Sequence, residues 1–255
     1  MADTLKPSTS LPRQDLHVTV TLRSDDGTRE TQQVSCDILR AISSWLVKNI
    51  AIDDCNAIAL DLTRTSAKAF KAAVHYSTQQ TLPAELCEAQ LNVERDIPAY
   101  LEKLIIECWI FGHLYHYHAF QNAVMHTFLD LKGRNPKTRS DIDNFPLAFF
   151  SLPPGSKMRK LMIEALVLGL RGSPDDTKRP YEWGWLKRFK GVVGFFAEFA
   201  DAMWDWDNGG EYEGVVRFAP GLNEFESKER YMVSAADDEN EEIMVEDDES
   251  EFAPE

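Results

Sequence analysis

The first regular pattern along the chain is an alternation of apolar and polar residues. Valine and leucine alternate with threonine over residues 18–22, which is the period of a strand with one buried face. Asp26-Gly27, a pair that favours hairpin turns, separates this segment from residues 29–34. In the second segment only Val34 is strongly apolar. The pattern predicts a hairpin whose second strand lies at a sheet edge.

Helical and extended patterns then follow in turn. Residues 37–49 carry leucine and isoleucine at spacings of three and four, which predicts a helix capped by Ser35 or Asp37. Residues 58–63 alternate again and predict a short third strand. Thr65 or Ser66 can cap the next helix, after which a loop leads to Pro98.

The strongest helical periodicity lies in the middle of the chain. Apolar residues recur at steps of three and four over residues 101–115 and again over residues 120–131, and Gly133 follows the second run. The two runs predict helices that pack as an antiparallel pair.

Three further segments complete the ordered part of the chain. Residues 145–152 are apolar, but the prolines in and after them predict that they do not form one regular helix. Ser156 begins a predicted helix that ends before Gly172. The last predicted helix runs from about Trp183 to Met203 and ordered structure is expected to end at Asp207, apart from a short pairing element at residues 215–218.

Charge is distributed very unevenly. The net charge is -15, but residues 207–255 hold 17 acidic residues against 3 basic ones, so the rest of the chain is nearly neutral. An acidic segment of this kind is typical of a disordered, solubilising tail, with a basic partner as the alternative. It repels phosphate backbones, which disfavours direct binding of nucleic acid.

Cysteine spacing and hydropathy indicate the compartment. The four cysteines are widely spread and no run of apolar residues reaches the length of a membrane span. The beginning of the chain has no apolar signal-peptide core. We therefore expect a protein of the cytoplasm, the nucleus or both, without membrane partners.

Several stretches resemble the BTB/POZ family. Residues 58–83 are similar to its third strand and following helix, and residues 104–130, with Cys-Trp-Ile-Phe-Gly leading to Phe-Gln-Asn-Ala-Val-Met, are similar to the final helix pair of many fungal BTB proteins. Residues 156–164 resemble a helix that follows the domain in those proteins. The hairpin turn at residues 24–27 is closer to the Skp-type adaptors of cullin ligases.

The resemblance implies a fold and a division of the chain. The fold class is α+β, a BTB/POZ-like domain with a short mixed sheet and surrounding helices, followed by a helical extension and an acidic tail. The expected parts are a flexible arm at residues 1–14, the domain at 15–131, the extension at 132–206 and the tail at 207–255. The family implies protein partners, through a homodimer or through a cullin scaffold.

Two surfaces are candidates for binding. The first predicted helix is the candidate self-association surface, with Ile38, Leu39, Ile42, Trp45 and Leu46. The last predicted helix is the candidate partner-binding helix, with Trp185, Phe189, Phe196 and Phe199. The alternative for this second helix is that it closes the core of the C-terminal part.

Catalytic chemistry has weak support. His113, His116 and His118 with Cys108 are the one cluster of metal-ligand types, but no zinc motif accompanies them, and Cys108 lies on an apolar helix face. We assign no catalytic, cofactor or metal residue. The predicted function is a non-enzymatic protein-interaction module, and the alternative is a substrate adaptor of a cullin-type ubiquitin ligase. An enzyme whose motif is not recognised ranks third.

Overall fold

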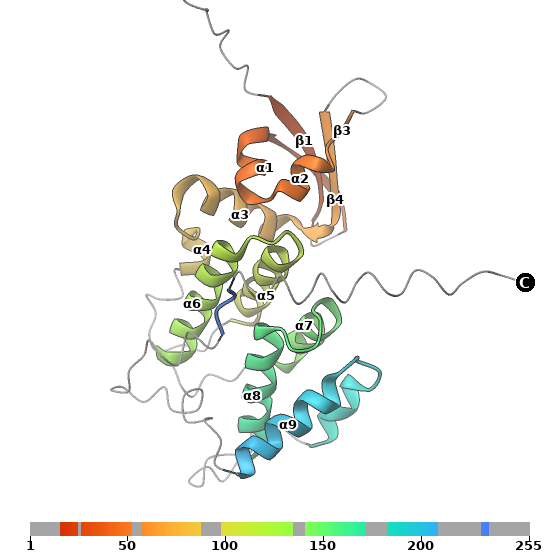
Figure 1. Cartoon of the computed structure of the whole chain (residues 1–255), viewed down its shortest axis with the longest axis vertical. Helices are drawn as coiled ribbons and strands as arrows, with labels where there is room; N and C mark the ends of the chain where they lie inside the picture. Colours follow the sequence, from red (N-terminus) through yellow and green to blue (C-terminus); the bar gives the residue numbers. More distant parts are fainter. Residues whose placement is uncertain are drawn as a thin grey trace, which may run out of the picture.

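The described part of the chain is an α+β fold with one small sheet and many helices. A computed structural model describes residues 16–24, 27–52, 58–87, 98–134, 141–171, 183–208 and 231–234. The sheet lies at one end of the molecule and the helices of the C-terminal half lie at the other (Figure 1). The predicted α+β class is confirmed.

The sheet is mixed and has the strand order β2-β1-β4-β3. β1 (His17–Arg23) pairs antiparallel with β2 (Arg29–Ser35) and parallel with β4 (Ile58–Ser66). The predicted hairpin and the edge position of its second strand are confirmed. β3 (Ala51–Ile52) pairs antiparallel with β4 and was not predicted, because two residues are too few to show an alternation.

The first predicted helix is divided in two. α1 (Cys36–Ile42) and α2 (Ser44–Lys48) are separated by Ser43, whose backbone is extended at φ -160°. The Ser43 hydroxyl accepts a hydrogen bond from the Trp45 amide at 3.1 Å, so it caps a new helix. The prediction of one helix over residues 37–49 was therefore wrong, because a local cap overrides a continuous apolar stripe.

The middle helices follow the sequence pattern. α3 (Ala67–Gln79) leads through α4 (Ala84–Cys87) to α5 (Ala99–Leu114), and residues 115–117 join α5 to α6 (His118–Arg134). α5 and α6 pack side by side, which confirms the predicted helix pair. Gly112 permits this approach, because a Cβ atom there would lie 2.3 Å from Gln121 Cγ.

The apolar segment after α6 is more regular than its prolines suggested. η2 (Ile142–Asn144) runs into α7 (Phe145–Ser151), and Pro146 lies in the first turn of α7. A proline in a first turn lacks an amide that would have no helical partner in any case. The expectation that Pro146 breaks a helix here was wrong. α8 (Lys157–Arg171) follows.

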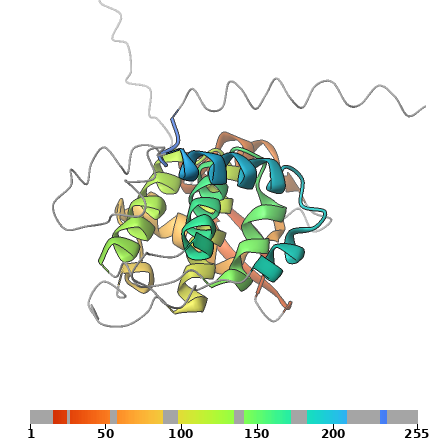
Figure 2. The same cartoon turned by 90° about the horizontal axis from the view of Figure 1, so that it is seen from below.

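The last predicted helix is also divided. η3 (Trp183–Phe189) is a 3-10 helix, and α9 (Phe195–Asp207) begins after a turn that contains Gly191 and Gly194. Both glycines have positive φ angles, 92° and 72°, which other residues rarely adopt. The turn reverses direction, so that α9 packs on α8 (Figure 2). The prediction of one helix from Trp183 to Met203 was wrong for this reason.

One apolar core spans the expected boundary at residue 131. Buried residues from β1 to α9 belong to a single cluster, which also includes Tyr231. Tyr231 is 1% exposed, although the sequence analysis placed it in the tail beyond the last ordered residue. Residues 231–234 thus return to the folded body, and the expectation that order ends at Asp207 was wrong. The expected arm at residues 1–14 and the pairing element at 215–218 lie outside the described residues.

A buried carboxylate joins α5 to the segment beyond residue 131. Glu102 is 1% exposed and pairs with Lys132 of α6 at 3.0 Å. Its other oxygen accepts hydrogen bonds from the Asp141 amide at 2.6 Å and from Asn144 Nδ2 at 3.4 Å. A buried charge needs such partners, so this network links the two parts of the chain.

A buried guanidinium holds the C-terminal helices together. Arg159 of α8 is 1% exposed and donates to the carbonyl oxygens of Leu152 at 3.0 Å and Val193 at 2.7 Å. It also forms an ion pair with Glu198 of α9. Nearby, the Tyr231 hydroxyl is hydrogen-bonded to the buried Glu164 carboxylate. Charged side chains therefore connect α7, α8, α9 and residue 231.

Candidate interaction surfaces

The candidate self-association surface is smaller than predicted. Leu39, Ile42 and Leu46 are buried in the core, and α1 packs against α3, β2 and α2. Ile38 is only partly buried. Trp45 is 46% exposed. In this conformation, only Ile38 and Trp45 of the five predicted residues can contact a partner.

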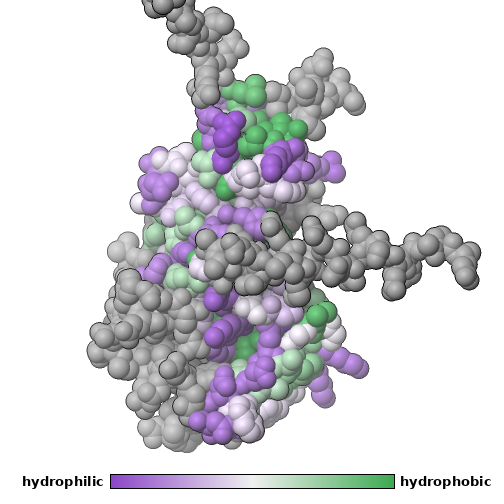
Figure 3. Space-filling view, in the orientation of Figure 1, coloured by the Kyte–Doolittle hydropathy of each residue, from purple (hydrophilic) through white to green (hydrophobic). Residues whose placement is uncertain are grey.

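Other apolar side chains of the N-terminal half are also exposed. Leu16 is half exposed, and its carbonyl accepts a hydrogen bond from the Cys36 amide at the start of α1. The Trp45 ring lies 5.4 Å from the ring of Tyr115, and the neighbouring Leu114 is half exposed. Figure 3 shows apolar residues gathered at the tip of the molecule where β1 begins. Leu16 and Leu114 were not among the predicted residues, because they precede or end an element and so add little to a periodic pattern.

The candidate partner-binding helix is mostly core. Phe189 and Phe199 are buried, and Trp185 is partly buried. The Phe189 ring stacks on that of Phe195 with 4.3 Å between centroids, in the middle of the C-terminal helices. Phe196 alone of the four predicted residues is strongly exposed. The alternative that these aromatic residues close the core is confirmed for Phe189 and Phe199.

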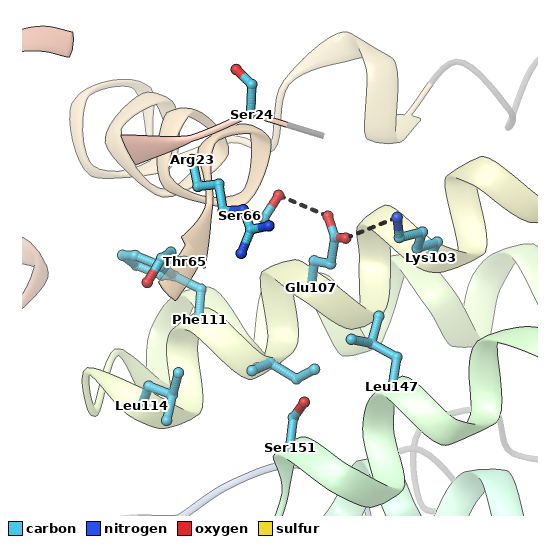
Figure 4. A pocket seen from close by; sticks show the side chains of 11 residues that line it. Arg23, Ser24, Thr65, Ser66, Lys103, Glu107, Phe111, Leu114, Leu147 and Ser151 are labelled. Atoms are coloured by element: carbon cyan, nitrogen blue, oxygen red, sulfur yellow. Dashed lines mark hydrogen bonds and ion pairs between the residues drawn. The ribbon is translucent and has the colours of Figure 1, made fainter. Parts of the chain in front are cut away.

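A cleft separates the end of the sheet from α7. It has a volume of about 260 Å³, and Arg23 and Ser66 line one side while Leu147 and Ser151 line the other (Figure 4). Glu107 of α5 lies at its floor, where it accepts a hydrogen bond from Ser66 Oγ at 2.8 Å and pairs with Lys103 at 3.6 Å. Both oxygens of the carboxylate are thus engaged by neighbouring side chains.

The candidate nucleophile is unsuited to chemistry. Cys108 is fully buried, and burial, followed by the adjacent Glu107 carboxylate, raises the pKa of its thiol far above the ordinary value. The thiolate is the reactive form of cysteine. Cys108 therefore acts as a small apolar side chain of α5.

The histidines lie at the turn between α5 and α6. The rings of His116 and His118 are 6.3 Å apart, and His113 stacks on Trp109 instead. Among the residues that the structure describes, no three histidine, cysteine or acidic side chains are arranged to hold a metal ion. Nor does any described helix combine the length and the apolar character needed to cross a membrane.

Comparison of the chain with models of protein families, with curated proteins and with solved structures found no match.

Proposed function

We propose that this chain is a non-enzymatic protein-interaction module whose N-terminal part is a BTB/POZ-type domain. The proposal is supported by the order of its elements, which is a hairpin, a pair of short helices, a strand, a helix and a helix pair. The same order carries the resemblance of the sequence to this family. The parallel pairing of β4 with β1 brings the segments on either side of α1 and α2 together in one sheet.

Self-association is the form of interaction that the N-terminal tip supports best. The observation that carries it is the exposure of Trp45, an aromatic side chain on a helix whose other apolar residues are buried (Leu46) or partly buried (Val47). Leu16 and Ile38 are further apolar side chains of the N-terminal part that are exposed or only partly buried. Aromatic residues at the centre of an interface dominate binding energy, while the polar rim adds little. We place the dimer contact at Leu16, Ile38 and Trp45.

The experiment is sedimentation of the full-length protein with matched variants. We expect Trp45→Ser and Leu16→Ser each to raise the dimer dissociation constant at least about tenfold, since each removes a buried apolar contact from the interface. Tyr100→Ser is the control, because Tyr100 is equally aromatic and 74% exposed but lies at the start of α5. It should leave the dissociation constant unchanged.

Two results would contradict this placement of the contact. Dimers of unchanged stability in both variants would move the interface elsewhere. A wild-type protein that stays monomeric would remove self-association and favour the alternative, an adaptor that binds a cullin scaffold one to one. Copurification with a cullin tests that alternative directly.

A further inference from the structure

The outer side of α9 presents an apolar stripe to solvent. Phe196, Ala200 and Trp204 follow one another at steps of four residues, which places them on one side of a helix. All three are exposed, Phe196 at 49% and Trp204 at 70%. The opposite side of α9 packs in the core through Phe195 and Phe199. The exposed stripe is thus additional to the contacts that fold the helix.

The exposed apolar surface also extends to the segment before α9. Val193, in the turn before the helix, is 76% exposed. Trp183 of η3 is 46% exposed and lies 6.4 Å from the ring of Phe199. Large apolar side chains that are exposed together mark an interaction surface more often than ones scattered singly. We call the four residues 193, 196, 200 and 204 the α9 stripe, and Trp183, which contacts Phe199 of the buried side, is not part of it.

Acidic side chains border the stripe at its C-terminal half. Asp201 and Asp205 are exposed and lie four residues apart, on the side of the helix next to Trp204. Asp207 ends the helix, whose last turn has no basic residue. The helix dipole is negative at this end, so acidic residues there are unfavourable for the helix. A sequence that breaks a local rule in this way often does so at a functional site.

We propose that the α9 stripe docks a basic amphipathic helix of a partner protein. The partner's apolar side chains lie on Phe196, Ala200 and Trp204, and its lysine or arginine residues reach Asp201 and Asp205. An arginine can in addition lie over the exposed Trp204 ring, where cation–π attraction contributes. Lys187 of η3 and Lys190, just after η3, are exposed near the N-terminal end of the stripe and repel cations there, so we place the partner's cations at the C-terminal half of α9.

Charge favours a basic partner helix over two other occupants of the stripe, residues 207–255 of this chain and a second copy of the chain. Residues 207–255, which continue from α9, carry 17 acidic and 3 basic residues, so this segment is repelled by Asp201 and Asp205. A second copy of the chain would bring the same acids together in a symmetric contact. A basic segment is attracted by both the helix and the residues that follow it. The surface is distinct from the N-terminal tip, so this inference goes beyond the proposed self-association.

The test uses the full-length protein and a synthetic peptide. The probe is a fluorescein-labelled 18-residue helical peptide of leucine and lysine with all leucines on one face, and its binding is measured by fluorescence anisotropy. We expect it to bind the wild-type chain, and Trp204→Ser and Ala200→Arg to weaken binding at least about tenfold. Tyr100→Ser is the matched control and should bind as the wild type does. The acidic segment 207–255 is present in every variant, so its attraction for the peptide is the same in all of them.

Three results would overturn the proposal. Unchanged binding by both Trp204→Ser and Ala200→Arg would mean that the acidic residues after α9 attract the peptide without the stripe. Equal binding of a peptide of the same composition with its leucines shuffled would mean that no apolar face is recognised. Equal binding of a leucine and glutamate peptide would remove the role of Asp201 and Asp205. Circular dichroism checks that both variants keep the wild-type helix content.

Discussion

The two halves of the molecule are stabilised in different ways. Around the sheet, the interior is made of neutral side chains, and the buried polar residues there are Ser43 and Thr65 among those the structure describes. In the C-terminal helices and at their junction with α5, three charged residues are buried, Glu102, Arg159 and Glu164. Each is engaged by partners from other segments.

The difference shows where a periodic pattern of apolar residues is sufficient to specify the fold. A sheet and the helices on it are specified by apolar residues at regular spacing, because burial itself selects the face that turns inward. Short helices joined by turns have less apolar surface to direct them. In that half, hydrogen bonds from a few buried charges select one arrangement, and losing one partner leaves the other charge buried.

The largest effect is expected for Arg159→Ala. The change removes the donor that hydrogen-bonds three backbone carbonyl groups and the Glu198 carboxylate. Because Glu198 then lacks its cation, the free energy of unfolding should fall by about 3–5 kcal/mol. Urea denaturation followed by tryptophan fluorescence measures it. Lys160→Ala, on an exposed position next to it, should change stability by less than about 0.5 kcal/mol. Equal effects of the two changes would mean that the buried charge does not hold the C-terminal helices.

A smaller loss is expected for Tyr231→Phe. The variant keeps the buried ring but removes the hydroxyl that donates to Glu164, so stability should fall by about 1.5–3 kcal/mol, the range for hydrogen bonds to charged groups. Tyr100→Phe, at a 74% exposed position, is the control. If thermal denaturation shows no difference between the two variants, residues 231–234 do not return to the core in solution.

The smallest effect is expected for Gly112→Ala, at the neutral contact between α5 and α6. The added methyl group would meet Gln121, which is itself buried, at a cost of about 1–3 kcal/mol for overpacking. A gain of up to about 1 kcal/mol from helix propensity offsets part of this, leaving a net loss near 1 kcal/mol. A Cβ atom at Gly184 would have no heavy atom within 4 Å, so Gly184→Ala should not lose stability through a clash. A stabilised Gly112→Ala protein would show that α5 and α6 have room to separate.

Prediction from sequence succeeded where the pattern is long and regular. The hairpin, the edge strand and the α5–α6 pair follow from periodicity alone. It failed where one residue decides the backbone: the Ser43 hydroxyl begins a new helix, Pro146 starts one, and Gly191 and Gly194 turn the chain before α9. Such local effects leave the apolar pattern unchanged, so a pattern cannot reveal them.

The candidate surfaces show the same limit. Apolar spacing selected the inner faces of these segments, which is why Leu39, Leu46 and Phe189 are core residues. Which side of an apolar helix meets solvent depends on neighbours far along the chain. Trp45 was among the predicted residues, but its exposure in the folded protein was needed to separate it from its buried neighbours, and Trp204 was found through its exposure alone.

The most direct test of the central claim is the molar mass of the unaltered full-length protein in solution. Light scattering during size-exclusion chromatography, repeated over a range of loaded concentrations, measures it without any variant or label. Self-association through the N-terminal tip predicts a mass of about 58 kDa, twice the 29.0 kDa of the chain, at the higher concentrations. A constant mass of 29.0 kDa at every concentration would contradict it.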